Sequence, residues 1–524
     1  MSASTEKKQR QAAREAGTDK KTLAEQEAAK KKAKSNRRWT LGTIGVILLI
    51  ALILFLNSSF LYTHTTAISI GDASYSPAEV NYVYANRYYN WIQSYGSYAS
   101  IFGLDTSTGI AGLKQQKCPM YDDGRTWHDY FMEEARSELS QMTALCAWAD
   151  ANGVTLTDEE IAEVDDSIAT LDSSARAGGY ASGDKYFSAN YGTGVTSAIV
   201  REMALKSALA NKASSEYAAS LEYTDAELEE HYQSLDGAQD KFSFSYYLVN
   251  AEKVESTDAD GNTSSAVTEE TTAAAKDAAD DILTAYTALK QSNPDDDNYT
   301  AMLNSAVAQV APTTEATERS NITGGNLGDY KEWLMESGRK AGDATVVDKA
   351  DGSGSYVVVF LDRSDNHYPV AQVRHILIKA VADSDGSYTD KAKEIAKNRA
   401  EEILAEFNAG DKTEDSFAEL AKDYSEDTGS AENGGLYDTV YKGATVEEFD
   451  KFCFEGHKKG DAAIVYGESS SYAGYHVMYY VGEGDLYSNL LAKNDLVNTT
   501  VSQWVEDQVN ALTVTNGWWL RIAG

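Results

Sequence analysis

Two histidines stand at matching places in this chain of 524 residues, each near the start of a short apolar run. His375 lies in the segment VRHILIK and His476 lies in GYHVMYYVG, and the whole chain has seven histidines. Because a histidine can donate, accept or carry a proton near neutral pH, two histidines placed in this way indicate a site. The alternative is that the two rings only satisfy each other's hydrogen bonds in a core.

The segments around these histidines predict a folded module over residues 371–484. Short apolar runs bounded by glycine and polar residues are typical of strands. The first run is followed by a charged helical segment, DKAKEIAKNRAEEILAEF, and the glycine-marked run YSEDTGSAENGG comes before the second.

The section over residues 241–366 looks like a second copy of this module. FSFSYYLVN corresponds to AQVRHILIK, an alanine-rich helical segment follows each, and the closing strands YVVVFLDR and HVMYYVGE also correspond. This correspondence places Tyr246 where His375 stands and Tyr356 where His476 stands. We therefore expect the first copy to keep the scaffold and to lack catalysis.

Both copies contain an Asp-x-Asp-Gly turn, at Asp258 and at Asp383. This spacing begins a calcium loop, but no glutamate occupies the twelfth position, where the bidentate ligand belongs. We interpret both segments as turns, and we expect neither a metal site nor a cofactor.

The charge of the chain is strongly acidic and unevenly distributed. The formal net charge is −35, although the first 62 residues carry an excess of basic residues. An acidic body repels phosphate backbones, so nucleic-acid binding is disfavoured. Three cysteines are too few for a disulfide framework; one bridge between Cys118 and Cys146 is conceivable, and Cys453 is expected to be a small buried residue.

The apolar run WTLGTIGVILLIALILFL predicts a transmembrane helix over residues 39–62. About 18 apolar residues at ~1.5 Å rise span most of a ~30 Å hydrocarbon layer. The run exceeds the length of a signal peptide's apolar region, and no small-x-small cleavage site follows it. Since residues 1–38 form a basic tail, we expect that tail in the cytoplasm and residues 63–524 outside, in a single-pass membrane protein.

Helical patterns dominate the next section, residues 63–240. A helix is expected to begin near Pro77, and Thr157 with Glu160 forms a capping pattern for another. Near the C-terminus, LVNTTVSQWVEDQVNAL predicts a helix with Trp504 and Val505 on its apolar face, which we expect to dock on the helical section.

The module over residues 371–484 resembles the parvulin-type peptidyl-prolyl isomerases. The matching features are VRHILIK, FAELAKDYSEDTGSAENGG, EEFDKFCF, a Lys-Gly-Asp turn and GYHVMYYVG. The whole layout is similar to membrane-anchored exported foldases (PrsA- or SurA-like). The resemblance implies an α+β fold, with a helical chaperone-like domain, a degenerate and then a complete parvulin-like domain, and a C-terminal helix over residues 485–524.

The resemblance implies that both histidines lie side by side on the central strands of a four-stranded antiparallel sheet. It gives catalytic roles to His375, His476 and Asp427. An X-Pro bond has a rotation barrier of ~18–20 kcal/mol, which a site lowers when it binds the twisted amide better than the planar forms. Neither histidine has to act as a nucleophile.

The implied substrate pocket contains an aromatic residue, Phe449, and we add Leu436 and Phe454 as apolar walls. Thr445 stands where the family usually has a methionine, which weakens one wall of the pocket. Ala473 stands where the family often has a small hydroxyl residue that hydrogen-bonds the histidine pair, so that hydrogen bond is lost.

The leading hypothesis is therefore an isomerase that assists the folding of exported proteins, with unfolded or partly folded polypeptides as partners. The alternative is a holding chaperone without catalysis, in which both sheet modules contact clients. A metal-dependent hydrolase or protease is disfavoured, because the chain has neither HExxH nor GxSxG.

Overall fold

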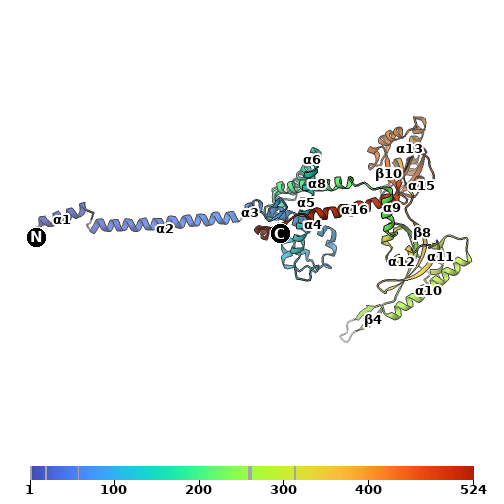
Figure 1. The fold of residues 1–524 in the computed structure, drawn as a ribbon, viewed down its shortest axis with the longest axis horizontal. Helices are drawn as coiled ribbons and strands as arrows, with labels where there is room; N and C mark the ends of the chain where they lie inside the picture. The colour runs from blue at the N-terminus through green and yellow to red at the C-terminus, as the bar shows by residue number, and fades with distance from the viewer. Residues whose placement is uncertain (1–2, 18–19, 57, 258–262, 312–313) are drawn as a thin grey trace. The chain divides into compact units, whose positions relative to one another are not determined.

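The structure is a computed structural model that describes residues 3–17, 20–56, 58–257, 263–311 and 314–524 (Figure 1). The chain divides into two compact units. Unit 1 consists of Met1–Leu221 and Thr499–Gly524, and unit 2 consists of Glu222–Asn498. The predicted α+β fold is confirmed, since unit 1 is mainly helical and unit 2 holds two four-stranded sheets.

The predicted transmembrane helix over residues 39–62 is wrong. Within the part of the chain that the structure describes, no helix combines the length and the apolar character that a membrane crossing needs. Helix α2 (Lys20–Leu56) includes the apolar run but begins in the charged tail, and a separate short helix, α3 (Phe60–His64), follows it. The single-pass localisation, the cytoplasmic tail and the placement of residues 63–524 outside a membrane were derived from that helix and are withdrawn with it.

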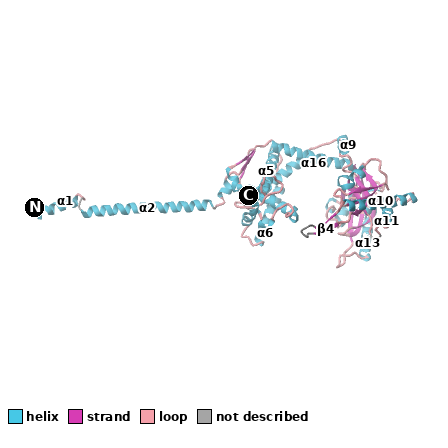
Figure 2. Ribbon diagram, turned by 90° about the horizontal axis from the view of Figure 1, so that it is seen from below, coloured by secondary structure: helices cyan, strands magenta, loops and turns pink. Residues whose placement is uncertain are grey.

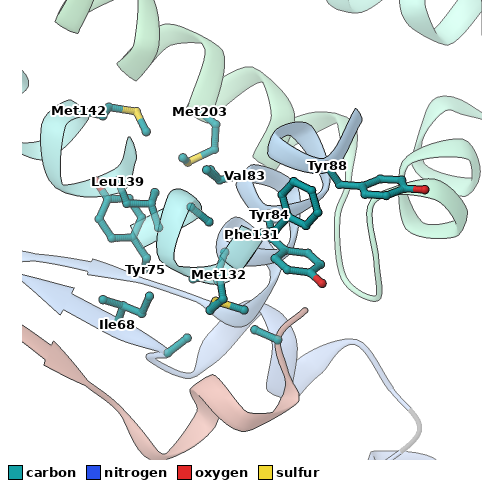
Figure 3. Packing of buried hydrophobic residues seen from close by; sticks show 14 of the residues in the cluster. Ile68, Tyr75, Val83, Tyr84, Tyr88, Phe131, Met132, Leu139, Met142 and Met203 are labelled. Atoms are coloured by element: carbon teal, nitrogen blue, oxygen red, sulfur yellow. The ribbon is translucent and has the colours of Figure 1, made fainter. Parts of the chain in front are cut away.

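Aromatic and aliphatic side chains from several helices form the core of unit 1 (Figure 3). Trp127, Phe131 and Tyr84 are almost fully buried, and Trp127 stacks on Phe131 at a ring-centroid distance of 5.8 Å. The α-helices described wholly within the unit are α1 (Ala3–Glu15), α2, α3, α4 (Pro77–Tyr95), α5 (Trp127–Asn152), α6 (Asp158–Ala177), α7 (Gly183–Asn190) and α8 (Ser197–Ala219). A small sheet of order β13-β1-β2 lies beside this core, formed by β1 (Ile68–Ile70), β2 (Ala73–Tyr75) and β13 (Val514–Asn516).

The helix starts that the sequence predicts in unit 1 are present. Ser76 caps α4 directly before Pro77, and Thr157 with Glu160 forms the capping box of α6. The C-terminal helix α16 (Tyr487–Asn510) also packs as expected, because Trp504 stacks on Tyr217 at 4.0 Å between ring centroids. All three cysteines are free, and Cys453 is buried as predicted.

The first sheet of unit 2 has the strand order β6-β3-β8-β7. Its faces are covered differently: helices α10 and α11 pack on one face, and aromatic residues of β3 and β8 pack with α12 on the other. The elements are β3 (Lys241–Asn250), β6 (Thr317–Thr323), β7 (Ala344–Asp348), β8 (Gly354–Ser364), α10 (Glu269–Ser292), α11 (Tyr299–Val307) and α12 (Lys331–Met335). A two-stranded hairpin, β4 (Val254–Thr257) with β5 (Thr263–Ala266), precedes α10, and the predicted turn at Asp258 lies outside the described residues.

The second sheet of unit 2 has the strand order β10-β9-β12-β11, also antiparallel throughout. The strands of unit 2 are magenta in Figure 2. Helices α13 and α14 pack on one face and helix α15 packs on the other. The elements are β9 (Pro369–Lys379), α13 (Asp390–Ala409), α14 (Glu414–Tyr424), β10 (Leu436–Val440), α15 (Glu447–Phe454), β11 (Ala462–Glu468) and β12 (Ala473–Leu486). A helix of unit 2 that lies outside both sheets, α9 (Asp225–Ser234), precedes them in the chain. The predicted turn at Asp383 is present, with a hydrogen bond of 2.9 Å from the Gly386 amide to the Asp383 carbonyl.

Candidate active site

The two central strands of the second sheet bring the predicted histidines together. His375 on β9 is paired with Met478, and His476 on β12 is paired with Leu377. Because residues two apart on a strand share a face, both histidines point to the same side of the sheet, the side that α15 covers. His375 is 3% exposed and His476 is 4% exposed, so each ring nitrogen needs a partner within the protein.

Those partners form one connected hydrogen-bond network. The Nδ1 atoms of His375 and His476 lie 3.0 Å apart, and the Nε2 atom of His375 lies 2.9 Å from the Oδ2 atom of Asp427. The hydroxyl of Ser430 donates to the same carboxylate oxygen at 2.5 Å, and the hydroxyl of Tyr437 donates to it at 3.1 Å. The structure therefore joins the three predicted catalytic residues and adds two hydroxyl donors at Asp427.

The loop that carries Asp427 is held directly on strand β9. The amide of Glu426 donates to the carbonyl of Leu377 at 2.8 Å, and the amide of His375 donates to the carbonyl of Gly435 at the other end of the loop, also at 2.8 Å. Gly435 has a φ of +71°, and a Cβ atom there would lie 2.1 Å from the His375 carbonyl oxygen. The glycines in YSEDTGSAENGG thus let the loop approach the strand closely enough to place Asp427 beside the histidine.

The environment fixes the charges of the network. Burial lowers the pKa of His476 to about 3, with a further lowering from His375. The hydrogen bond from His375, and after it the one from Ser430, holds the pKa of the Asp427 carboxyl well below its usual range, although burial opposes them. Burial and the neighbouring Asp427 raise the pKa of Tyr437 to about 12. Near neutral pH the site therefore holds a neutral His476, an anionic Asp427 and a protonated Tyr437.

Aromatic rings border this network on the side of α15. The ring of Phe449 meets His375 at 5.4 Å and His476 at 5.3 Å between centroids. The ring of Tyr437 lies 4.9 Å from His375 and 6.1 Å from Phe449. Phe449 is thus found where the sequence placed it, and Tyr437 forms a second, more exposed aromatic surface beside the same polar groups.

The other predicted pocket residues lie at varying distances from the histidines. Leu436 is the first residue of β10 and is half-buried, beside Tyr437. Phe454 lies at the far end of α15 and packs on Tyr368 at 5.7 Å, and no described ring contact joins it to the histidines. Thr445 places its hydroxyl in a buried position without a described hydrogen-bond partner, before the start of α15.

Ala473 has no side-chain hydroxyl, yet His476 is not left without a partner. Ala473 is buried at the start of β12, where its carbonyl accepts a hydrogen bond of 2.7 Å from the amide of Ala380. The hydroxyl of the preceding residue, Tyr472, lies 3.0 Å from the Nε2 atom of His476. The sequence reasoning missed Tyr472, Ser430 and Tyr437; Ser430 lay within the glycine-marked run that the sequence had already singled out.

Part of the chain is similar to known proteins. Residues 358–480 match the family profile described as a PPIC-type PPIASE domain. A foldase protein PrsA 3 from Bacillus anthracis is 30% identical over 29% of this chain and 48% of its own length. A foldase protein PrsA from Staphylococcus aureus (strain Newman) is 36% identical over 26% of this chain and 40% of its own length. The chain thus spans about half or less of the length of these curated relatives.

One solved structure that the chain resembles is that of a peptidylprolyl isomerase (PrsA) from Bacillus anthracis. It is 24% identical, covers 28% of this chain and 59% of the solved chain, and superposes with a TM-score of 0.18. The family match and the curated relatives confirm the resemblance to peptidyl-prolyl isomerases of the parvulin type.

Proposed function

From the PPIC-type PPIase domain that residues 358–480 form, we propose that the chain accelerates cis-trans isomerisation of X-Pro bonds in unfolded or partly folded polypeptides. The observation that carries this proposal is the network of His375, His476 and Asp427 beside the ring of Phe449. The relatives named foldases support a role in protein folding.

The chemistry of the reaction fits a site of this kind. Rotation about an X-Pro bond breaks no covalent bond, so the site needs neither a nucleophile nor a cofactor. It has to stabilise an amide that has lost its resonance, in which the carbonyl oxygen and the nitrogen are no longer conjugated. The ring of Phe449 offers a surface for the pyrrolidine ring, and Tyr437 offers a second aromatic surface next to it.

In this proposal the polar residues act on the carbonyl side of the X-Pro bond, opposite the pyrrolidine ring. Asp427 holds a fixed negative charge, and the three side chains that donate to it keep that charge in one position. A charge that is already oriented costs little reorganisation when the amide twists. In this proposal the histidine pair orients Asp427 and keeps the pocket in one shape, without transferring a proton to the substrate.

A second candidate, a holding chaperone without catalysis, is favoured by one observation in the first sheet. Tyr246, Tyr330 and Tyr356 contact one another there through three ring pairs at 5.4 to 5.8 Å between centroids. All three side chains are partly exposed. Aromatic residues of this kind offer a large contact area for an unfolded segment at low entropic cost.

An isomerisation assay with the full chain tests the first proposal. The substrate is a short peptide with one X-Pro bond, and the rate is compared with the uncatalysed rate of the same peptide. We expect a wild-type rate above the uncatalysed one and a loss of that excess in the His375→Ala variant. A wild-type rate equal to the uncatalysed rate would exclude catalysis, and suppression of client aggregation by the same preparation would then support the holding chaperone.

A further inference from the structure

The outer end of the histidine network lies against the edge strand β11. The Nε2 atom of His476, the ring nitrogen that faces away from His375, lies 3.0 Å from the hydroxyl oxygen of Tyr472. On β11, the residue next to this hydrogen bond is Gly467, which pairs with Gly474 on β12. A Cβ atom at Gly467 would lie 2.6 Å from the Nε2 atom of His476 and 2.9 Å from the Tyr472 hydroxyl.

The missing side chain at Gly467 therefore leaves the space in which this hydrogen bond forms. The φ of Gly467 is not in the left-handed region, so the backbone itself does not require glycine. The ring of Tyr472 also contacts the imidazole edge-on, at 5.8 Å between centroids. Two residues outside the predicted site, Tyr472 and Gly467, thus lie at the Nε2 atom of His476 and shape its surroundings.

The network has a single direction when both imidazoles are neutral. The ionised Asp427 can only accept, and the Ser430 hydroxyl, 3.2 Å from the Nε2 atom of His375, already donates to Asp427. The Nε2 atom of His375 therefore carries a proton and donates it to the carboxylate. The Nδ1 atom of His375 is then an acceptor, and the Nδ1–H group of His476 donates to it. The Nε2 atom of His476 is left as an acceptor, and the only donor described within hydrogen-bond distance of it is Tyr472.

We propose that Tyr472, in the space left by Gly467, is a positioning residue that fixes the tautomers of His476 and His375 and thereby the orientation of Asp427. Without this hydroxyl, the buried Nε2 atom of His476 lacks a donor. If that atom carried the proton instead, the Nδ1 atom of His476 would become an acceptor and the Nδ1 atom of His375 would have to donate to it. His375 would then present a bare Nε2 atom to the carboxylate, which is repulsive. The kinetic consequence rests on the proposed isomerase function; the tautomer assignment does not.

The position of Tyr472 also accounts for the alanine that follows it. The parvulin resemblance implies a small hydroxyl residue at position 473, and the chain has alanine there. A tyrosine one residue earlier reaches the same histidine from the turn before β12, where its longer side chain spans the added distance. The loss of the hydrogen bond predicted from Ala473 is therefore compensated by its neighbour.

The test uses the full chain with 15N-labelled histidine, and the readout is the set of ring-nitrogen chemical shifts at a pH where both imidazoles are neutral. These shifts distinguish protonated from unprotonated ring nitrogens. In the wild type we expect the Nδ1 atom of His476 and the Nε2 atom of His375 to be protonated. In Tyr472→Phe we expect mixed tautomers at both histidines, with kcat about tenfold lower and KM changed by less than about twofold.

Two further variants make the result decisive. Gly467→Ala should shift the same resonances, because the added methyl group occupies the space of the hydrogen bond. Tyr475→Phe is the matched control: its ring lies on the opposite face of β12, against Tyr466 at 5.1 Å, and it should change neither tautomer nor kcat. Unchanged histidine shifts in Tyr472→Phe would overturn the proposal. If Tyr472→Phe shifts the tautomers but the wild type has no isomerase activity, the positioning role of Tyr472 is upheld and only the proposed function is refuted.

Discussion

The two sheets of unit 2 share their strand pairing and differ in what they carry at two matching positions. In the second sheet His476 pairs with Leu377 and Met478 with His375. In the first sheet Tyr356 pairs with Leu248 and Val358 with Tyr246, which is the same register. Tyrosines at these positions pack with each other and with Tyr330, whereas the histidines hydrogen-bond to each other and to a loop.

The difference shows that the scaffold and the site are separable. Gly354 and Gly474 occupy equivalent places at the start of β8 and of β12. A Cβ atom would lie 2.3 Å from the Val249 carbonyl oxygen at the first and 2.4 Å from the Ile378 carbonyl oxygen at the second. The same close approach of strands is therefore kept in both sheets, and the second combines it with a pair of hydrogen-bonded histidines.

The largest expected effect comes from removing the charge at the centre of that network. Asp427→Ala should lower kcat/KM by about 100-fold, because a fixed charge and the acceptor for three side-chain donors are lost together. Tyr356→Phe in the first sheet is the matched control and should leave kcat/KM unchanged. A substantial loss of isomerase activity in Tyr356→Phe would show that both sheets take part in catalysis. It would contradict the assignment of the active site to the second sheet.

The shared scaffold is tested by the equivalent glycines. Gly354→Ala and Gly474→Ala should each lower the free energy of unfolding of their own sheet by about 1–3 kcal/mol, since the methyl group would be forced against a backbone carbonyl. Hydrogen exchange resolved by peptide reports each sheet separately. If one alanine were tolerated and the other were not, the two sheets would have different strand spacing and the common scaffold would be refuted.

The two sheets should also differ in their response to acid. The folded state holds the pKa of His476 at about 3, below its ordinary value of about 6.5, so the unfolded state binds the proton more readily. This contribution to stability is present above pH ~6.5 and decreases as the pH falls from there toward the folded pKa, by about 1–2 kcal/mol at pH 5. The low pKa of Asp427 adds a loss in the same direction at lower pH.

Hydrogen exchange at pH 7 and pH 5 checks this difference. We expect protection to decrease in β9 and β12 more than in β3 and β8, which carry tyrosines at the matching positions. His367 lies in the connection between the sheets. Burial lowers its pKa, but the hydrogen bond with Glu229 and the charges of Glu229 and Asp365 together outweigh this and raise the pKa, so its contribution to stability is lost as the pH rises. Equal acid sensitivity of both sheets would assign the effect to residues other than His476.

The smallest expected effect concerns the tyrosine cluster itself. Tyr330→Ala should weaken suppression of client aggregation by about two- to tenfold, because the variant loses the ring that contacts Tyr246 and Tyr356. The value of kcat/KM should be unchanged. The assay follows light scattering of a denatured client at increasing concentrations of the full chain. Unchanged suppression by Tyr330→Ala would leave the first sheet without a part in client binding.

Much of the site could be predicted from sequence, because strand register and glycine-marked loops leave regular patterns. His375, His476, Asp427 and Phe449 come together as the resemblance to parvulin-type isomerases implied. Phe454 does not join them, since five residues on a helix correspond to a rotation of about 140°, away from the face of Phe449.

Other features depend on contacts that no local pattern records. Tyr472 was missed because the sequence reasoning looked for a hydroxyl one residue later, at Ala473, and the length of a tyrosine side chain is what lets it reach His476. The apolar run before Asn57 predicted a membrane helix because the prediction used only the length and the apolar composition of the run. In the structure it belongs to a longer helix that starts at Lys20 among charged residues.

The pairing of β9 with β12 has a consequence for how the chain acquires its activity. The two histidines are 101 positions apart in the sequence, and everything between them has to be looped out before their rings meet. Closing so long a loop is entropically unfavourable, and such distant pairings form slowly compared with local helices. A protein of this design, which we propose assists the folding of others, has no active site until its own slowest contacts have formed.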